Sequence, residues 1–181
     1  MTVLSRWVRA ILFAMLWVPA CGRAAPSEYQ VKAVFLFNFG QFVEWPKQTF
    51  DTPLAPFVIC VLGDDPFGKT LDDVVRGETA DNRSLVVRRL ADAADAPNCN
   101  ILFVGRGDPQ KLDDALAAAR GRSVLTVTDI DGAERHGAII VLFEDNKRIR
   151  MRINLAAAKA NHLVISSKLL RPAEVVGAEG G

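Results

Sequence analysis

Two adjacent carboxylates, Asp64 and Asp65, are the first residues whose types and spacing could do chemistry. They follow an apolar run at 57–63 that has the length of a buried strand. A pair of acids can serve as general acid and general base when burial raises the pKa of one carboxyl above that of the other. Adjacent residues on a turn more often both face water, so the sequence favours a polar turn here over a hydrolase site.

Glycines near these acids raise the question of a nucleotide site. Gly63 and Gly68 flank the aspartates, and Gly105 and Gly107 flank Arg106 after a second apolar run. The first set does not have the G-x-G-x-x-G spacing of a dinucleotide-binding turn, and the second lacks both its third glycine and the lysine of a phosphate-binding loop. Carboxylates at this position would also repel phosphates. The sequence therefore predicts no nucleotide cofactor.

The histidines and serines offer little further chemistry. His136 and His162 lack the i, i+4 or H-E-x-x-H neighbours of a metal site. Ser166 and Ser167 lack the G-x-S-x-G turn of a serine hydrolase. We therefore predict that the protein has no metal, no cofactor and no catalytic residues, and is not an enzyme.

A basic stripe lies near the C-terminus. Arg148, Arg150 and Arg152 alternate with apolar residues, as in a strand with one buried face and one wet face. A solvated sheet face is the favoured interpretation, and binding of an acidic ligand or partner is the alternative.

The elements that must position these residues alternate between helix and strand. Apolar periodicity predicts helices over 28–45, 66–76, 109–120 and 155–173, the last with an interruption at 164–165, and strands over 57–63, 84–90, 100–105 and 124–128. A final pair of strands, 138–143 and 149–153, reads as an antiparallel hairpin. The predicted fold class is α/β: a three-layer sandwich around a mostly parallel, mixed sheet with a C-terminal antiparallel hairpin.

Composition limits the classes of protein. The chain has 181 residues, 50% of them hydrophobic and 24% charged, which excludes a disordered chain. The formal net charge of +1 gives no basic excess, so we expect no nucleic-acid partner. No long linker or internal repeat divides the chain, and we predict a single domain over 25–181.

The first 24 residues have the layout of a secretory signal peptide. Arg6 and Arg9 precede the short apolar run 10–18, and small residues follow at Gly22 and Ala24. Cleavage after Ala24 would export the mature protein from the cytosol. A buried N-terminal helix and a lipoprotein cut before Cys21, which would anchor the chain to a membrane, are less favoured alternatives.

Cleavage after Ala24 would leave two cysteines, Cys60 and Cys99. An even number in an oxidising compartment favours a disulfide bond over two buried thiols. Such a bridge would close a loop of about 40 residues and contribute about 4 kcal/mol in the chain-entropy model.

The helix predicted at 28–45 is apolar almost all round. Such a helix is either deeply buried or keeps a second face for a partner or a second copy of the chain. Core packing is favoured, and the candidate interface residues are Phe35, Phe39, Phe42 and Trp45.

In several stretches, taken in order, the chain resembles the YfiR-like periplasmic repressor family. They are YQVKAVFLFN (29–38), FVEWP (42–46), ICVLGDDPF (59–67), CNILFV (99–104), VLTVTD (124–129), RIRMRIN (148–154) and ISSKLL (165–170). Together they span nearly all of the mature chain.

The resemblance implies a non-enzymatic regulator with the cysteine pair bridged. It implies a protein that binds the periplasmic domain of an inner-membrane diguanylate cyclase, holds that enzyme inactive and keeps cyclic-di-GMP low. An outer-membrane lipoprotein that sequesters the repressor is the further partner it implies. Related domains fused to sensor kinases suggest the alternative, a periplasmic small-ligand-binding sensor with a pocket near Gly63, Gly105 and Asp129, beyond the carboxyl ends of the strands.

Overall fold

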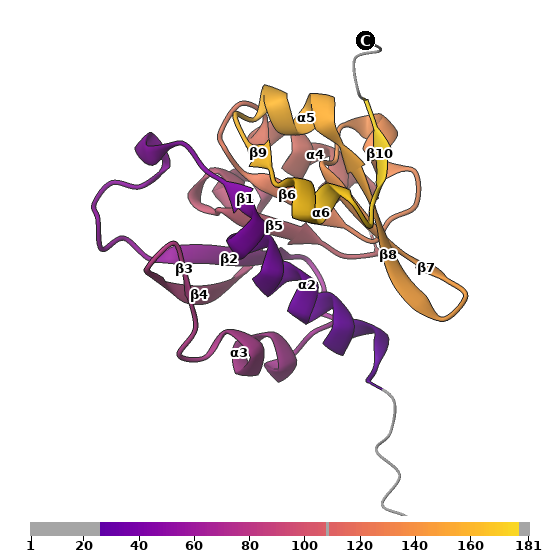
Figure 1. Ribbon diagram of the computed structural model, residues 1–181, viewed down its shortest axis with the longest axis horizontal. Coiled ribbons are helices and arrows are strands. Elements are labelled where there is room, and N and C mark those ends of the chain that lie inside the picture. Colours follow the sequence, from indigo (N-terminus) through magenta and orange to yellow (C-terminus); the bar gives the residue numbers. More distant parts are fainter. Residues whose placement is uncertain (1–25, 108, 178–181) are drawn as a thin grey trace, which may run out of the picture.

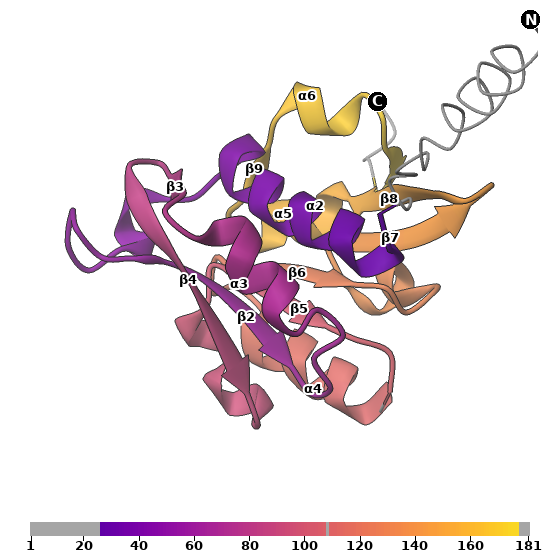
Figure 2. The same ribbon diagram turned by 90° about the horizontal axis from the view of Figure 1, so that it is seen from below.

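The computed structural model describes residues 26–107 and 109–177 (Figure 1). Within these ranges, eight strands form one sheet in the order β10-β8-β7-β6-β5-β2-β4-β3, and β1 pairs with β9 in a separate two-stranded sheet. Helices cover both faces of the large sheet (Figure 2). The predicted fold class, a three-layer α/β sandwich around a mixed sheet, is confirmed.

The centre of the sheet is parallel. Its strands are β4 (Arg83–Leu90), β2 (Phe57–Leu62), β5 (Ile101–Val104), β6 (Leu125–Thr128) and β7 (Ile140–Asp145). Every residue of β2, β5 and β6 is buried, because both faces of these strands are covered. The continuous apolar runs in the sequence are the signature of this double burial.

The edges of the sheet are more irregular. The strand β8 (Arg148–Asn154) pairs antiparallel with β7, which confirms the predicted hairpin. The short strand β10 (Glu174–Val176) then adds parallel to β8. At the opposite edge, β3 (Thr79–Ala80) pairs antiparallel with β4.

Two apolar cores lie on opposite faces of the sheet. The first contains residues of α2 (Glu28–Phe42), α3 (Lys69–Val75), α5 (Leu155–Ala160) and α6 (Ser167–Leu170). The second contains residues of α4 (Pro109–Ala119) and of the 3-10 segment η2 (Ala93–Asn98). Figure 2 shows α2 and α3 on one side of β2 and β5, and α4 on the other. The remaining 3-10 segments are η1 (Lys47–Thr49) and η3 (Ala133–His136).

The helix α2 begins with a capping box. The Ser27 side chain accepts from the backbone N–H of Gln30, and the Gln30 side chain accepts from the backbone N–H of Ser27. The helix ends at Phe42, three residues before the predicted end at Trp45. The prediction was wrong there because Val43 and Glu44 leave the helix as β1 and pair with β9 (Val164–Ile165). The predicted interruption at 164–165 is confirmed by the same strand pair.

No helix in the described ranges has the length and apolar character needed to cross a membrane.

Candidate functional site

The chain reverses its direction across the sheet between β2 and β5. From β2 it moves outward to β4, and it then returns to place β5 on the other side of β2. In open α/β sheets, ligands bind outside the carboxyl ends of the strands at such a point. Asp64, Arg106 and Asp129 directly or closely follow the carboxyl ends of β2, β5 and β6.

A buried ion pair occupies the position beyond β6. The ammonium group of Lys32, on α2, has 0% exposure and lies 2.6 Å from Oδ2 of Asp129, which is also fully buried. Glu28, one turn earlier on α2, is a second carboxylate partner of the same ammonium group. A buried charge is tolerated only when it is paired in this way, so the cluster fixes α2 against the end of β6.

Two more residues complete this charged cluster. The hydroxyl group of Tyr29 donates to Oδ2 of Asp129 at 3.0 Å. The partly exposed guanidinium of Arg106 lies 3.5 Å from the same carboxylate and 3.4 Å from Glu28. The other oxygen of Asp129, Oδ1, is buried without a hydrogen-bond partner within the described part of the chain. The acid that the sequence placed beside a ligand pocket is therefore paired with the protein's own cations.

The charged cluster makes the phenol of Tyr29 less acidic. Burial raises the pKa of Tyr29 to about 12, and the nearby negative charge of Asp129 and its hydrogen bond add to this effect. The Tyr29 hydroxyl group therefore keeps its proton to a higher pH than an ordinary tyrosine does.

Asp64 and Asp65 belong to a turn. Oδ1 of Asp65 accepts from the backbone N–H groups of Phe67 at 2.8 Å and Gly68 at 3.2 Å, and its Oδ2 lies 2.9 Å from Nε of Arg89. Asp64 is exposed. This arrangement agrees with a polar turn and differs from a paired-acid site, in which one carboxyl sits in an apolar environment.

Sequence reasoning missed Lys32. A lysine four residues after a glutamate on a helix is usually read as a surface pair. The sequence did hold one signal, because Lys32 lies among apolar residues of a helix that is apolar almost all round. A lysine in such a helix is expected to be buried with a carboxylate partner.

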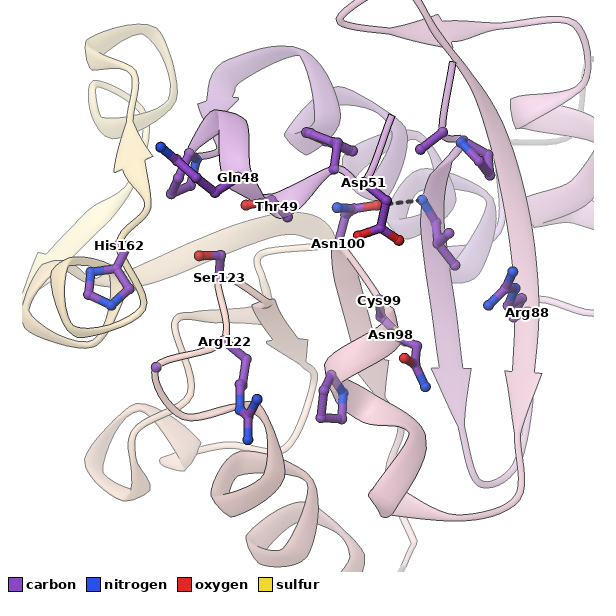
Figure 3. Close-up of a pocket in the computed structure, with 17 residues that line it drawn as sticks. Gln48, Thr49, Asp51, Arg88, Asn98, Cys99, Asn100, Arg122, Ser123 and His162 are labelled. Atoms are coloured by element: carbon purple, nitrogen blue, oxygen red, sulfur yellow. Dashed lines mark hydrogen bonds between the residues drawn. The ribbon is translucent and has the colours of Figure 1, made fainter. Parts of the chain in front are cut away.

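A second candidate site lies at the opposite, amino ends of the central strands. An open pocket of about 640 Å³ lies there. Its lining residues include Arg88, Asn100, Arg122, Ser123 and His162 (Figure 3). Residues that come from β4, the start of β5 and the turns before β6 and β9 therefore meet at one hollow.

Asn100, which lines this amino-end pocket, is held to the neighbouring strand β2 by two hydrogen bonds. Oδ1 of Asn100 accepts from the backbone N–H of Val58 at 2.7 Å, and its backbone N–H donates to Val58 at 2.9 Å (Figure 3). Ser123 and His162 hold φ angles of 57° and 59°, a region that non-glycine residues rarely adopt. Strained backbone of this kind is often kept where a site requires it.

The predicted disulfide is confirmed. Cys60, in β2, and Cys99, just before β5, are bonded with their Cα atoms 5.9 Å apart. Both residues are buried in the second core, and Cys99 also lines the amino-end pocket. The bridge therefore ties two adjacent central strands together beside that pocket.

Of the four candidate interface residues, one is fully buried and three are half-buried. Phe39 has 0% exposure and lies in the first core, whereas Phe35, Phe42 and Trp45 are half-buried and pack against that core. Trp45 also contacts Phe57 edge to face, with ring centroids 4.8 Å apart.

The basic stripe is partly neutralised. Arg150 lies 3.1 Å from Asp145, and Arg152 lies 3.3 Å from Glu174. Arg148 is exposed, and no carboxylate of the described residues lies within ion-pair distance of it. The stripe is therefore mainly a solvated face with one unpaired cation.

The histidine and serine candidates, His136 and Ser166, have partners within the protein. Nδ1 of His136 lies 3.6 Å from Asp113, and the Ser166 side chain caps α6 by accepting from the backbone N–H of Lys168. In residues 26–107 and 109–177, no group of three or more His, Cys, Asp or Glu side chains could hold a metal ion.

Comparison with known proteins gives a family and a fold. A family model described as YfiR/HmsC-like matches residues 29–174. A crystal structure of a conserved domain protein from Vibrio cholerae O1 biovar El Tor aligns with a TM-score of 0.51 at 14% identity, over 65% of this chain. At this low identity the likeness concerns the fold alone, and this chain covers 54% of that longer chain. No curated protein matches the chain significantly.

Proposed function

The chain belongs to the YfiR/HmsC-like family, and on this premise we propose that it binds and represses an inner-membrane diguanylate cyclase. Family membership points to a periplasmic regulator of cyclic-di-GMP signalling. The finer proposal is that the mature chain docks on the periplasmic part of the cyclase, holds it inactive and lowers cyclic-di-GMP.

The observation that carries this proposal is the family match over 29–174, which includes almost every element of the fold. The state of the polar groups supports it. Asp129 is paired with Lys32, and Asp65 is paired with Arg89, so these carboxylates stabilise the fold and are not held ready for a substrate.

The proposed contact surface includes the half-buried aromatic residues of the first core. Phe35, Phe42 and Trp45 each expose part of a ring while the rest is anchored, which is typical of residues at protein interfaces. Phe39, which is fully buried, would support the neighbouring ring of Phe35, whose centroid is 6.0 Å away.

The first experiment measures the second messenger in cells. Deleting the gene should raise cyclic-di-GMP, and the full chain should restore the low level. A version without residues 1–24 should fail to restore it, because it would lack the export segment. An unchanged cyclic-di-GMP level after deletion would contradict repression.

The second experiment measures the contact. The purified mature chain should capture the purified periplasmic domain of a cyclase from the same organism. Phe35→Ala and Trp45→Ala should each weaken capture by about tenfold or more if these rings are anchors. A matched control is Phe50→Ala, another half-buried ring outside α2. Equal capture by all four proteins would remove these rings from the interface.

Two further partners belong to this proposal. An outer-membrane lipoprotein would compete with the cyclase for the repressor, and a second copy of the chain would form a homodimer through an apolar face. Competition in the capture experiment tests the lipoprotein, and analytical ultracentrifugation tests the dimer.

A second candidate function, a periplasmic small-ligand sensor, is favoured by the amino-end pocket. The pocket is open, and its lining carries Arg88, Arg122 and His162 against one carboxylate, Asp51, which suits a small anionic molecule. A screen of small carboxylates and phosphates should then find compounds that raise the melting temperature of the wild type but not of Arg122→Ala. A screen without any shift would exclude this function.

A further inference from the structure

Only part of the outer edge of β8 is paired with another strand in the described residues. The strand runs from Arg148 to Asn154, but β10 pairs with it only at Arg152, Ile153 and Asn154. The other side of β8 is paired with β7 from Arg148 to Ile153. The segment 148–151, called the open edge below, is therefore the free border of the sheet.

The hairpin geometry shows which backbone groups face outward. Asn146 and Lys147 have φ angles of 50° and 62°, as in a two-residue type I′ turn. In such a hairpin the flanking residues, Asp145 and Arg148, form a hydrogen-bonded pair, and bonded and non-bonded pairs alternate from there. The N–H groups of Ile149 and Met151 and the C=O group of Ile149 therefore point away from β7, towards the open edge.

A groove follows this edge. A pocket of about 560 Å³ is lined by all four residues of the open edge together with Phe35, Asp145, Asn146 and Pro172. Successive residues of a strand point to opposite faces, so a pocket touched by four in a row must run along the border. Figures 1 and 2 both show the β7–β8 hairpin projecting from the body of the molecule.

The two sides of the groove differ in chemistry. Ile149 and Met151 pack with the first core, on the side where Phe35 of α2 lies. On the opposite side, Arg150 is held by Asp145 and Glu174, whereas the exposed Arg148 has no carboxylate partner among the described residues. One side of the groove therefore accepts apolar side chains, and the other offers an unpaired cation.

We propose that the open edge binds an extended segment of a partner protein, which adds a strand beside Arg148–Met151. The bound segment has apolar side chains on the Phe35 side and an acidic side chain facing Arg148. This inference rests on the proposed function in one respect: the segment belongs to the periplasmic part of the cyclase.

A second copy of this chain is the less suitable occupant. Antiparallel pairing of two open edges would set arginines of one copy opposite arginines of the other, and like charges directly opposite destabilise a strand pair. A partner strand with acidic residues has the complementary charge.

Amide hydrogen exchange of the mature protein, measured by NMR, provides the first test. In the free protein, the amides of Ile149 and Met151 should exchange faster than those of Arg150 and Arg152. Addition of the cyclase periplasmic domain should slow exchange at Ile149 and Met151. Docking that involves side chains alone would not produce this alternating pattern.

Matched variants provide the second test. Ile149→Pro removes an outward N–H without breaking a bond to β7, and it should reduce capture at least about tenfold, whereas Ile149→Val should not. Arg148→Glu should have a similar effect. Its control is Lys111→Glu, the same charge change at an exposed site on α4, over the other face of the sheet.

A synthetic peptide of alternating valine and glutamate separates the two proposals. If the cyclase domain binds without protecting Ile149 and Met151, the strand-addition proposal is wrong and the proposed function stands. If the cyclase domain does not bind but the peptide protects both amides, the proposed function is wrong and the open edge is still a strand-binding site. If neither probe protects the two amides, the inference is wrong. The arginines would then serve to prevent edge-to-edge aggregation.

Discussion

A lysine ammonium group with no exposure to water needs carboxylates within reach, and Lys32 has two. Its pairing with Asp129 connects the first helix of the described chain to the end of β6, 97 residues later. Because the group sits between α2 and the sheet, its role is to fix the position of the helix that carries Phe35 and Phe42.

Lys32→Met should destabilise the protein by about 3–5 kcal/mol, because it leaves the Asp129 carboxylate buried with one cation fewer. Chemical denaturation with fluorescence detection would measure the loss. The double variant Lys32→Met with Asp129→Leu should recover most of it, since a buried apolar pair replaces the ion pair. A double variant as unstable as the single one would mean that the pair does more than balance charge.

Tyr29 is the single tyrosine of the chain, so its titration can be followed without interference from another phenol. Tyrosinate absorbance should give a pKa of about 12 in the folded protein, against an ordinary value of 10.0. Because the folded state holds this proton more tightly, the stability from Tyr29 is complete below pH 10 and is lost as the pH rises towards 12.

Tyr29→Phe provides the control for this titration. It should lose the bond to Asp129 at neutral pH and flatten the fall in stability above pH 10. A wild-type titration midpoint at the ordinary value would show that the hydroxyl is not held in the cluster.

At the scale of single residues, the sequence predicted part of the site. The Cys60–Cys99 bridge followed from cysteine count and compartment, and the polar turn at Asp64 and Asp65 followed from neighbouring residues. Lys32, Tyr29 and Arg106 meet Asp129 only through the fold, so no local pattern could have linked them.

At the scale of elements, the β7–β8 hairpin sets the shape of the open edge. Its turn places two non-glycine residues, Asn146 and Lys147, at positive φ. Asparagine tolerates this conformation well, whereas lysine has a Cβ that resists it.

Lys147→Gly should therefore stabilise the protein by about 0.5–1 kcal/mol, since glycine adopts positive φ without strain. Thermal unfolding would measure the gain. Lys147→Ala is the matched control, because it removes the same long side chain but keeps the Cβ. Equal melting temperatures for the two variants would contradict relief of backbone strain as the cause.

The central strands were predicted well, whereas the short elements and the C-terminal helical region were not, since the helix predicted over 155–173 is two short helices, α5 and α6. The strands β2, β5 and β6 were visible because their apolar runs are buried on both faces. The two-residue strands β1 and β9 have no periodicity of their own, and they exist because the chain pairs Val43 with Ile165. The helix end at Phe42 was missed for the same reason.

At the scale of the whole molecule, the disulfide joins the middle of the sheet. Cys60→Ser should lower stability by a few kcal/mol, because the unfolded chain regains the freedom of a loop with a sequence separation of 39. Cys60→Ala would separate loss of the bridge from burial of a hydroxyl group. Calorimetry with and without reductant should show a shift in melting temperature for the wild type alone, and equal melting in both conditions would mean that the bridge contributes nothing.

The fold class as a whole could be predicted because the same pattern, an apolar strand followed by a helix, recurs along the chain. Alternating apolar strands and helices, one after another, point to a parallel sheet covered on both faces. The position of an open pocket could not be predicted in the same way. The carboxyl-end position near Asp129 is taken by Lys32, and the open pocket formed by Asn100, Ser123 and His162 depends on three distant turns.

The pairing of Val43 with Ile165 also bears on how the chain acquires its structure during synthesis or transport. Contacts between residues so far apart in sequence form slowly, because a long loop must close before they gain anything. The two-stranded sheet β1–β9 cannot form until Ile165 has emerged from a ribosome or a translocation channel. The eight-stranded sheet does not include β1 or β9, so this small sheet is among the last contacts that the emerging chain can make.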